Sequence, residues 1–233
     1  MNTGVKSSAG RKSEPQTERV VDALTVAIHQ HRLSPGTKLG EDELAEIYGV
    51  SRTIIRAALH SLAHHHLVEI RRNRGAFVAQ PSIREAHEVF ETRALLEPSM
   101  ARRAAERMAP DALQRLNRHI NEETAALQSG DRGAALHLSG LFHIEIARIA
   151  QHDTIAGIVE ALVARSSLII ALYWRRESAL CEKHAHNALL DALAQGDGPA
   201  AEDLMKSHLV DLHTALDLRE RAKSSLSLKD ALS

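Results

Sequence analysis

One helix stops and another starts within two residues of each other near position 50. Three acidic residues, 41–43, open a helical segment at the end where the helix dipole favours negative charge. Gly49 suits the left-handed conformation that ends a helix, and Ser51 suits the N-cap of the next one. The spacing therefore predicts two helices joined by a very tight turn.

A further helix precedes this turn and a hairpin follows it. Apolar residues recur at three- and four-residue steps over 20–28, which indicates an amphipathic helix. Two short β-like runs, 67–70 and 76–79, are separated by a polar loop that ends in a glycine. Three helices followed by such a hairpin predict a winged helix-turn-helix.

The remainder of the chain shows helical periods only. No β-like alternation occurs from residue 83 to about residue 221, and breaks at 109–110, 129–131, 151–153 and 196–199 divide this region into about six helices. The predicted fold class is mainly α, with an N-terminal winged helix-turn-helix followed by an all-α bundle. The predicted parts are a disordered arm (1–15), a DNA-binding domain (16–80), an all-helical domain (83–222) and a flexible tail (223–233).

Nucleic-acid binding needs a local cluster of cations, because the chain as a whole has a formal net charge of −1. Arg side chains can pair with guanine, while Ser and Thr hydroxyls suit phosphate oxygens. Isolated charges of this kind also occur at ordinary solvated helix starts, but the adjoining tight turn and basic hairpin favour DNA contact. The candidates at the start of the second helix are Ser51, Arg52, Thr53 and Arg56.

The hairpin tip is also basic. Arginine side chains there can contact phosphates or enter the minor groove, and a glycine permits close approach of the backbone. The candidates in this wing are Arg71, Arg72, Arg74 and Gly75.

Three histidines of the helical region form a candidate metal site. His186 and His208 lie eleven residues before and after Asp197, so two antiparallel helices would hold them at one height. His143, in another apolar helix, can join them across the bundle. Three imidazoles suit Zn²⁺ or Ni²⁺. The alternative is three unrelated core or surface histidines, which spacing alone leaves open.

Two arginines on apolar helices are candidate ligand-binding residues. Arg93 and Arg165 would favour a carboxylate or phosphate ligand if both faced one cavity. Glu97 lies four residues after Arg93, so an intrahelical ion pair is the alternative.

Several motifs together resemble the GntR family of transcription regulators. In the N-terminal half these are 35–39, 43–45, 49–53, 56–59 and 73–78. The second half resembles the helical effector-binding domain of the FadR-like subgroup, the FCD type, through 91–97, 142–143, 186–192, 196–197 and 205–209.

This resemblance implies a homodimer that binds a pseudo-palindromic DNA operator and responds to a small metabolite, often an organic acid. It also implies a divalent metal ion held by three His and one Asp in many members. His143, His186 and His208 match the three histidines, but Ser139 stands where the aspartate is expected. A metal would therefore have only three protein ligands from this set.

The leading hypothesis is a transcription regulator, with a repressor favoured over an activator. The sequence shows neither a signal peptide nor a run of eighteen apolar residues, which predicts a cytoplasmic protein with no membrane partner. One alternative is a metal-dependent enzyme that uses the three histidines, with an accessory N-terminal domain. Another is a purely structural dimerisation bundle. Because no catalytic motif is evident, we predict no enzyme activity and no catalytic residues.

Overall fold

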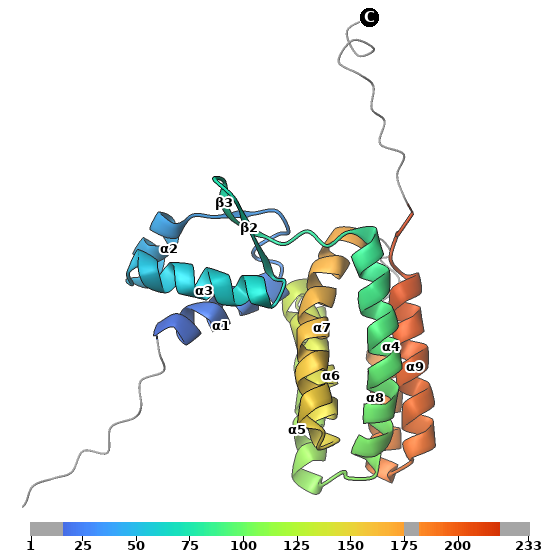
Figure 1. Cartoon of the computed structure of the whole chain (residues 1–233). Helices are drawn as coiled ribbons and strands as arrows, with labels where there is room; N and C mark the ends of the chain where they lie inside the picture. Colours follow the sequence, from blue (N-terminus) through green and yellow to red (C-terminus); the bar gives the residue numbers. More distant parts are fainter. Residues whose placement is uncertain (1–15, 175–181, 220–233) are drawn as a thin grey trace, which may run out of the picture.

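The computed structural model describes residues 16–174 and 182–219. The predicted arm (1–15) and tail (223–233) therefore lie outside the described residues. Figure 1 shows two parts, a smaller one with three helices and a sheet, and a bundle of long helices beside it. The predicted fold class, a winged helix-turn-helix followed by an all-α bundle, is confirmed.

The smaller part contains three helices and a three-stranded sheet. Strand β3 lies in the middle, antiparallel to both neighbours, in the order β1-β3-β2. The predicted hairpin is β2–β3, and β1 is an addition whose two residues are too few to show a hydrophobic period. The elements are α1 (Gln16–His29), β1 (Lys38–Leu39), α2 (Glu41–Tyr48), α3 (Arg52–His64), β2 (Val68–Arg71) and β3 (Gly75–Val78).

The tight turn between α2 and α3 has the predicted chemistry. Gly49 adopts a left-handed conformation with φ of 62°, which ends α2. The Ser51 hydroxyl accepts a hydrogen bond from the Ile54 N–H at 3.4 Å, which caps α3. One face of α3, including Ile55 and Leu59, is buried in a core shared with α1. The opposite face of α3 is consequently exposed to solvent, and its orientation is fixed by the turn to α2 and by packing against α1.

The larger part contains six described helices. Side-chain caps begin α4, α6, α7 and α9 at Ser82, Asp131, His152 and Asp197. Helix α7 ends at Tyr173, and this end was not predicted from the sequence. The helices are α4 (Ile83–Ala105), α5 (Pro110–Gln128), α6 (Arg132–Ile149), α7 (Asp153–Tyr173), α8 (Glu182–Gln195) and α9 (Gly198–Thr214).

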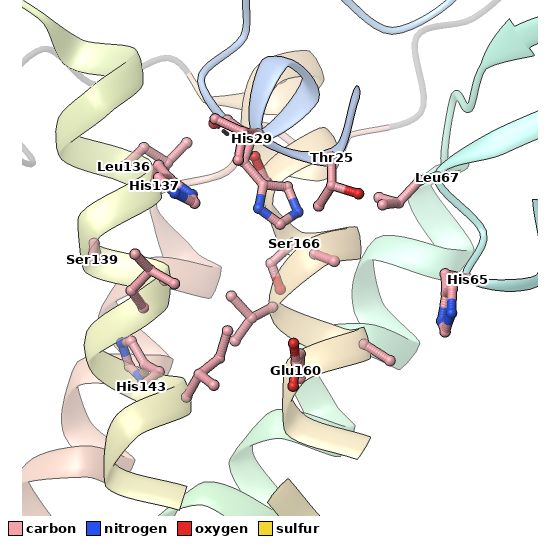
Figure 2. Close-up of a pocket in the computed structure, with 18 of the residues that line it drawn as sticks. Thr25, His29, His65, Leu67, Leu136, His137, Ser139, His143, Glu160 and Ser166 are labelled. Carbon is pink, nitrogen blue, oxygen red and sulfur yellow. Dashed lines mark hydrogen bonds between the residues drawn. The ribbon is translucent and has the colours of Figure 1, made fainter. Parts of the chain in front are cut away.

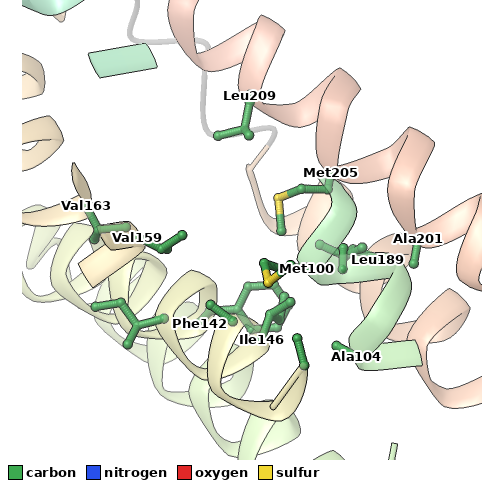
Figure 3. Packing of buried hydrophobic residues seen from close by; sticks show 14 of the residues in the cluster. Met100, Ala104, Phe142, Ile146, Val159, Val163, Leu189, Ala201, Met205 and Leu209 are labelled. Carbon is green, nitrogen blue, oxygen red and sulfur yellow. The ribbon is translucent and has the colours of Figure 1, made fainter. Parts of the chain in front are cut away.

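Aliphatic and methionine side chains fill most of the bundle core. Figure 3 shows Phe142 of α6 facing Met100 of α4, with Met205 of α9 and Leu189 of α8 nearby. All four side chains are almost fully buried. This core joins α4, α6, α8 and α9, which are the helices that carry the three candidate histidines and Arg93.

Helix α7 is long and apolar enough to cross a membrane by length and composition alone. Its most apolar stretch has a mean hydropathy of 1.9, and 56% of that stretch is buried inside the protein. It packs against α4 and α6, and its residues Ala164 and Leu168 complete the core of the smaller part. Its apolar character is thus used in packing within the fold.

The two parts are joined by a short connection and by a packed seam, in which the end of α1 lies against α6 and α7. Between β3 and α4, the Tyr173 hydroxyl of α7 donates a hydrogen bond to the Pro81 carbonyl at 2.8 Å. In the seam, the Ser167 hydroxyl donates to the His29 carbonyl at 3.2 Å. At Gly133 of α6 a side chain would overlap the carbonyl group of Gln30, so the glycine permits this close approach. The parts therefore contact each other directly.

We expect Gly133→Ala to loosen this seam. The added Cβ would lie 2.9 Å from the Gln30 carbonyl carbon, so the end of α1 must move away from α6. Overpacking of this kind costs about 1–3 kcal/mol. Thermal unfolding should show a lower midpoint, and limited proteolysis should cut faster between the two parts.

Gly157→Ala is the matched control, because a Cβ at this position in α7 would meet no atom within 4 Å. It should leave proteolysis unchanged and stabilise α7 by up to about 1 kcal/mol. If Gly133→Ala and Gly157→Ala gave the same unfolding midpoint and the same rate of proteolysis, the packed seam would be contradicted.

Candidate functional site

The structure brings together the three histidines that sequence spacing selected. His143, His186 and His208 are at most 4% exposed and come from α6, α8 and α9. The Nε2 atom of His208 lies 3.2 Å from that of His143 and 3.2 Å from that of His186. One nitrogen from each ring lies within 4.8 Å of the other two. The three rings thus converge on a single point inside the bundle.

Two buried carboxylates orient two of these rings. The His143 Nδ1–H donates to Glu97 at 2.6 Å, and the His186 Nδ1–H donates to Glu123 at 2.9 Å. A ring held this way keeps its Nε2 lone pair available, which is how carboxylate-oriented histidines bind metal ions. Glu97 and Glu123 therefore aim His143 and His186 at the common point.

Sequence analysis missed the role of Glu123. On α5 it continues a buried face formed by Ala112, Leu116 and Ile120. A carboxylate on an apolar helix face needs a buried partner, and that position was the available signal. Glu97 was noticed only as a partner of Arg93.

Arg93 makes the burial of Glu97 possible. Its guanidinium donates to both carboxylate oxygens, at 2.5 and 3.2 Å, and also to the Ser166 hydroxyl at 3.1 Å. Burial alone would raise the pKa of Glu97, but Arg93 and His143 outweigh that effect and lower the pKa to about 2. The predicted intrahelical pair is therefore present, and Glu97 is ionised.

Burial acts in the opposite sense on the histidines. It lowers the pKa of His143, although the Glu97 carboxylate partly offsets the effect. Burial, followed by the neighbouring rings of His143 and His186, lowers the pKa of His208 well below its ordinary value. Both rings are neutral at pH 7, which is the form that binds metal ions.

The spacing of the three Nε2 atoms suits a cation. Lone pairs of His143 and His186 both point at the Nε2 of His208, which can carry only one proton and so cannot satisfy both. Two nitrogens bound tetrahedrally to one Zn²⁺ at about 2.0–2.1 Å lie about 3.4 Å apart. The observed 3.2 Å separations are close to that value. The residues present therefore fit a divalent ion.

A cavity of about 690 Å³ adjoins this centre, and of the three histidines it is lined by His143. His143, Ser139 and Arg93 line it, and Ser139 lies one helical turn before His143 on α6 (Figure 2). Arg165 is not among the lining residues. Its guanidinium lies 3.6 Å from the Glu85 carboxylate at the start of α4. The structure therefore brings Arg93 to the cavity and places Arg165 elsewhere, unlike the arrangement we expected.

The candidate DNA-contact residues of α3 form an exposed group. Ser51, Arg52, Thr53 and Arg56 are all exposed. Arg56 donates to Glu41 of α2 at 2.8 and 3.3 Å, and Arg52 pairs with Asp42. The acidic first turn of α2 thus lies against the basic start of α3.

The wing places its basic residues in two environments. Arg71 pairs with Glu69 at 2.8 Å and stacks over the Phe77 ring at 4.6 Å, so it is held within the sheet. Arg72 and Arg74 are exposed at the tip, and no ion pair holds either of them in the described part of the chain. Gly75 has φ of 91°, a backbone conformation that favours glycine.

Comparisons with known proteins agree with this architecture. Residues 16–78 match the gntR family of bacterial regulatory proteins, and residues 88–211 match the FCD domain. The chain belongs to the GntR family. As a member with an FCD domain, it is a DNA-binding transcription regulator.

Relatives of this GntR regulator align along most of its length. The galactonate operon transcriptional repressor of Escherichia coli K12 is 30% identical over 211 residues, covering 80% of this chain and 90% of the relative. The HTH-type transcriptional repressor RspR of the same strain is 26% identical over 203 residues, covering 86% and 88%. A GntR structure from Rhodococcus sp. RHA1 superposes with a TM-score of 0.76 at 23% identity, covering 88% and 99%, and shares the fold.

We expect Glu97→Gln to destabilise this GntR regulator strongly. The substitution leaves the buried Arg93 guanidinium without its counter-charge, a change that typically costs about 3–5 kcal/mol. Urea unfolding would measure the loss. Glu91→Gln, the same change at an exposed position of α4, should alter the free energy of unfolding by less than about 0.5 kcal/mol. Similar values for both variants would contradict the role given to Glu97.

Proposed function

We propose that this GntR regulator binds a pseudo-palindromic operator as a homodimer and that a small organic acid bound in its FCD domain changes that binding. The observation that carries the effector part is the convergence of three buried histidines, two of them held by carboxylates, beside a cavity. We assign DNA binding to residues 16–80 and effector binding and dimerisation to residues 83–222. Repression is favoured because both curated relatives described above are named repressors.

DNA contact is assigned to the start of α3 and to the wing. Ser51 and Thr53 would contact phosphates, while Arg52 and Arg56 would reach base edges in the major groove. Their ion pairs with α2 are exposed, and exposed pairs contribute only about 0–1 kcal/mol, so DNA can displace the acids at small cost. A two-fold dimer would place two such surfaces on the two half-sites.

The wing would add backbone contacts. Arg72 and Arg74 stand exposed at its tip, and Gly75 allows the chain to approach phosphates closely. Arg71, held by Glu69 and Phe77, supports the shape of the hairpin and can reach DNA only if that pair opens.

The three histidines would hold one Zn²⁺ or Ni²⁺ ion. When bound, such an ion supplies open coordination positions for a carboxylate. Ser139 lines the cavity one helical turn before His143, and its side chain is smaller than the aspartate that the family resemblance implies there. Our proposal is that a ligand carboxylate takes this place.

The charges around the site favour an anionic ligand. Two buried carboxylates, Glu97 and Glu123, outweigh the single guanidinium of Arg93 by one negative charge. A divalent cation reverses that balance to one positive charge. A monocarboxylate would then bring the buried site to neutrality, which is the least costly state in a low-dielectric interior.

Regulation is favoured over catalysis by the positions of the carboxylates. Glu97 and Glu123 bond to Nδ1 atoms, on the side of each ring away from the converging Nε2 atoms. In that position neither can act as a general base towards a ligand at the histidines. We therefore propose no enzyme activity, and a cytoplasmic location consistent with contact to DNA.

Removal of Arg56 should weaken operator binding. An operator selected from random duplex DNA with the wild-type protein provides the probe. Arg56→Ala should raise its Kd by at least about fivefold, corresponding to about 1 kcal/mol, if the side chain reads a base. Arg84→Ala removes another exposed, ion-paired arginine, from α4, and should leave the Kd unchanged. If Arg56→Ala binds the operator as tightly as wild type, α3 is not used in this way.

Metal content tests the three-histidine site. Elemental analysis of tag-free protein loaded with Zn²⁺ or Ni²⁺ should find about one ion per chain, because three ligands converge. His186→Ala should lose the ion, whereas His60→Ala, at an exposed position of α3, should keep it. If the wild-type protein binds no ion after Zn²⁺ or Ni²⁺ is added, a metal at this site is ruled out.

A further inference from the structure

The cavity that His143 lines crosses the boundary between the two parts of the chain. From His143 and Ser139 it extends along α6 and α7 to α1, where Val21, Thr25 and His29 line it (Figure 2). Helix α1 belongs to the DNA-binding domain. One wall of the proposed effector cavity is therefore part of the domain whose DNA contact the effector would control.

The dimensions of the cavity favour an elongated ligand. On α6 the lining residues extend from Leu136 to Ile144, a helix rise of about 12 Å. The volume of about 690 Å³ lies in the range of pockets that enclose drug-sized molecules. A short polyhydroxylated acid bound at the histidines would leave the α1 end of the cavity unfilled.

The lining is apolar between two polar ends. Leu141, Val163 and Ile170 line the cavity together with His143 and Arg93, and Figure 2 shows His143 at the opposite end from His29. Burying an apolar ligand body against an apolar wall makes the free energy of binding more favourable. Burying hydroxyl groups there without hydrogen-bond partners makes it less favourable.

The α1 end offers a hydrogen bond to a neutral group. The Nε2 atom of His29 is buried without a hydrogen-bond partner. Burial, and then the nearby rings of His137 and His31, lowers the pKa of His29 to about 4, so its ring is neutral at pH 7. Asp22 of α1 also lines the cavity and opposes a second negative charge at this end.

We propose that the ligand is an elongated monocarboxylate whose carboxylate lies at the three histidines and whose apolar body carries a distal hydroxyl or carbonyl group to His29. This inference rests on the proposed effector function and specifies its ligand class. The ligand touches both domains at once, so it acts on α1 directly.

Helix α1 can pass this contact on to the DNA-binding surface. It packs along α3 through Val20, Leu24 and Ile28, while its end is held to α7 by the His29 and His31 contacts with Ser167. A ligand that displaces Thr25 or His29 therefore moves α3 relative to the bundle. The ligand selects the arrangement of the two domains that accommodates it.

The test compares three acids on the zinc-loaded full chain. Calorimetry would measure the Kd of 10-hydroxydecanoate, decanoate and D-gluconate. We expect 10-hydroxydecanoate to bind at least about tenfold more tightly than gluconate because of its apolar body. It should also bind about fivefold more tightly than decanoate, which is the contribution of one hydrogen bond.

Two variants of α1 test its part in the site. His29→Phe should reduce the preference for 10-hydroxydecanoate over decanoate to below about twofold and leave the decanoate Kd unchanged. Thr25→Leu, which introduces a better helix former, should weaken the binding of both long acids and leave gluconate binding unchanged, because the larger side chain fills the α1 end only. His60→Phe, at an exposed position, is the control and should change none of these values.

Operator binding separates the failure of this inference from failure of the proposed function. If gluconate binds more tightly than the long acids and weakens operator binding, the ligand class is wrong and the effector function stands. The inference is also wrong if the His29→Phe variant still binds 10-hydroxydecanoate about fivefold more tightly than decanoate. If none of the three acids binds or changes operator affinity, both the ligand class and the effector function are contradicted.

Discussion

A buried carboxylate on α4 cannot stay ionised without partners on both sides, and the centre of the bundle is arranged around that requirement. Glu97 lies between the Arg93 guanidinium and the His143 ring, while Arg93 also donates to Ser166 of α7. These contacts join α4, α6 and α7 at one depth. His208 and His186 then bring α9 and α8 to the same point, so the polar centre sets the register of five helices, with α5 added through Glu123.

Local signals predicted much of the fold, because caps and short periods act over a few residues. Gly49 and Ser51 placed the turn between α2 and α3, and the symmetric spacing about Asp197 selected His186 and His208. Contacts between distant segments left weaker signals. Glu123 meets His186 across 63 positions, and β1 exists only because β3 lies beside it. The direction of Arg165 likewise depends on Glu85, a residue of another helix.

The proposed DNA-contact surface shows a second balance of charges. Acidic residues of the first turn of α2 stabilise that helix through its dipole and also neutralise Arg52 and Arg56 in the free protein. Such a surface attracts phosphate less strongly at long range than the number of its arginines suggests. Recognition then depends more on close fit than on overall charge, in keeping with the formal net charge of −1.

The short connection between β3 and α4 limits how freely the two domains can be exchanged in engineered chimeras. The Pro81 carbonyl is held by Tyr173, the end of α1 rests on Gly133, and His31 bonds the Ser167 carbonyl at 3.0 Å. The Gly133 and Ser167 contacts join residues of one module to residues of the other, and the Tyr173 contact holds the linker to α7. A fusion that kept only the linker would lose the two direct contacts, so this DNA-binding domain and its helical partner form a unit of exchange together.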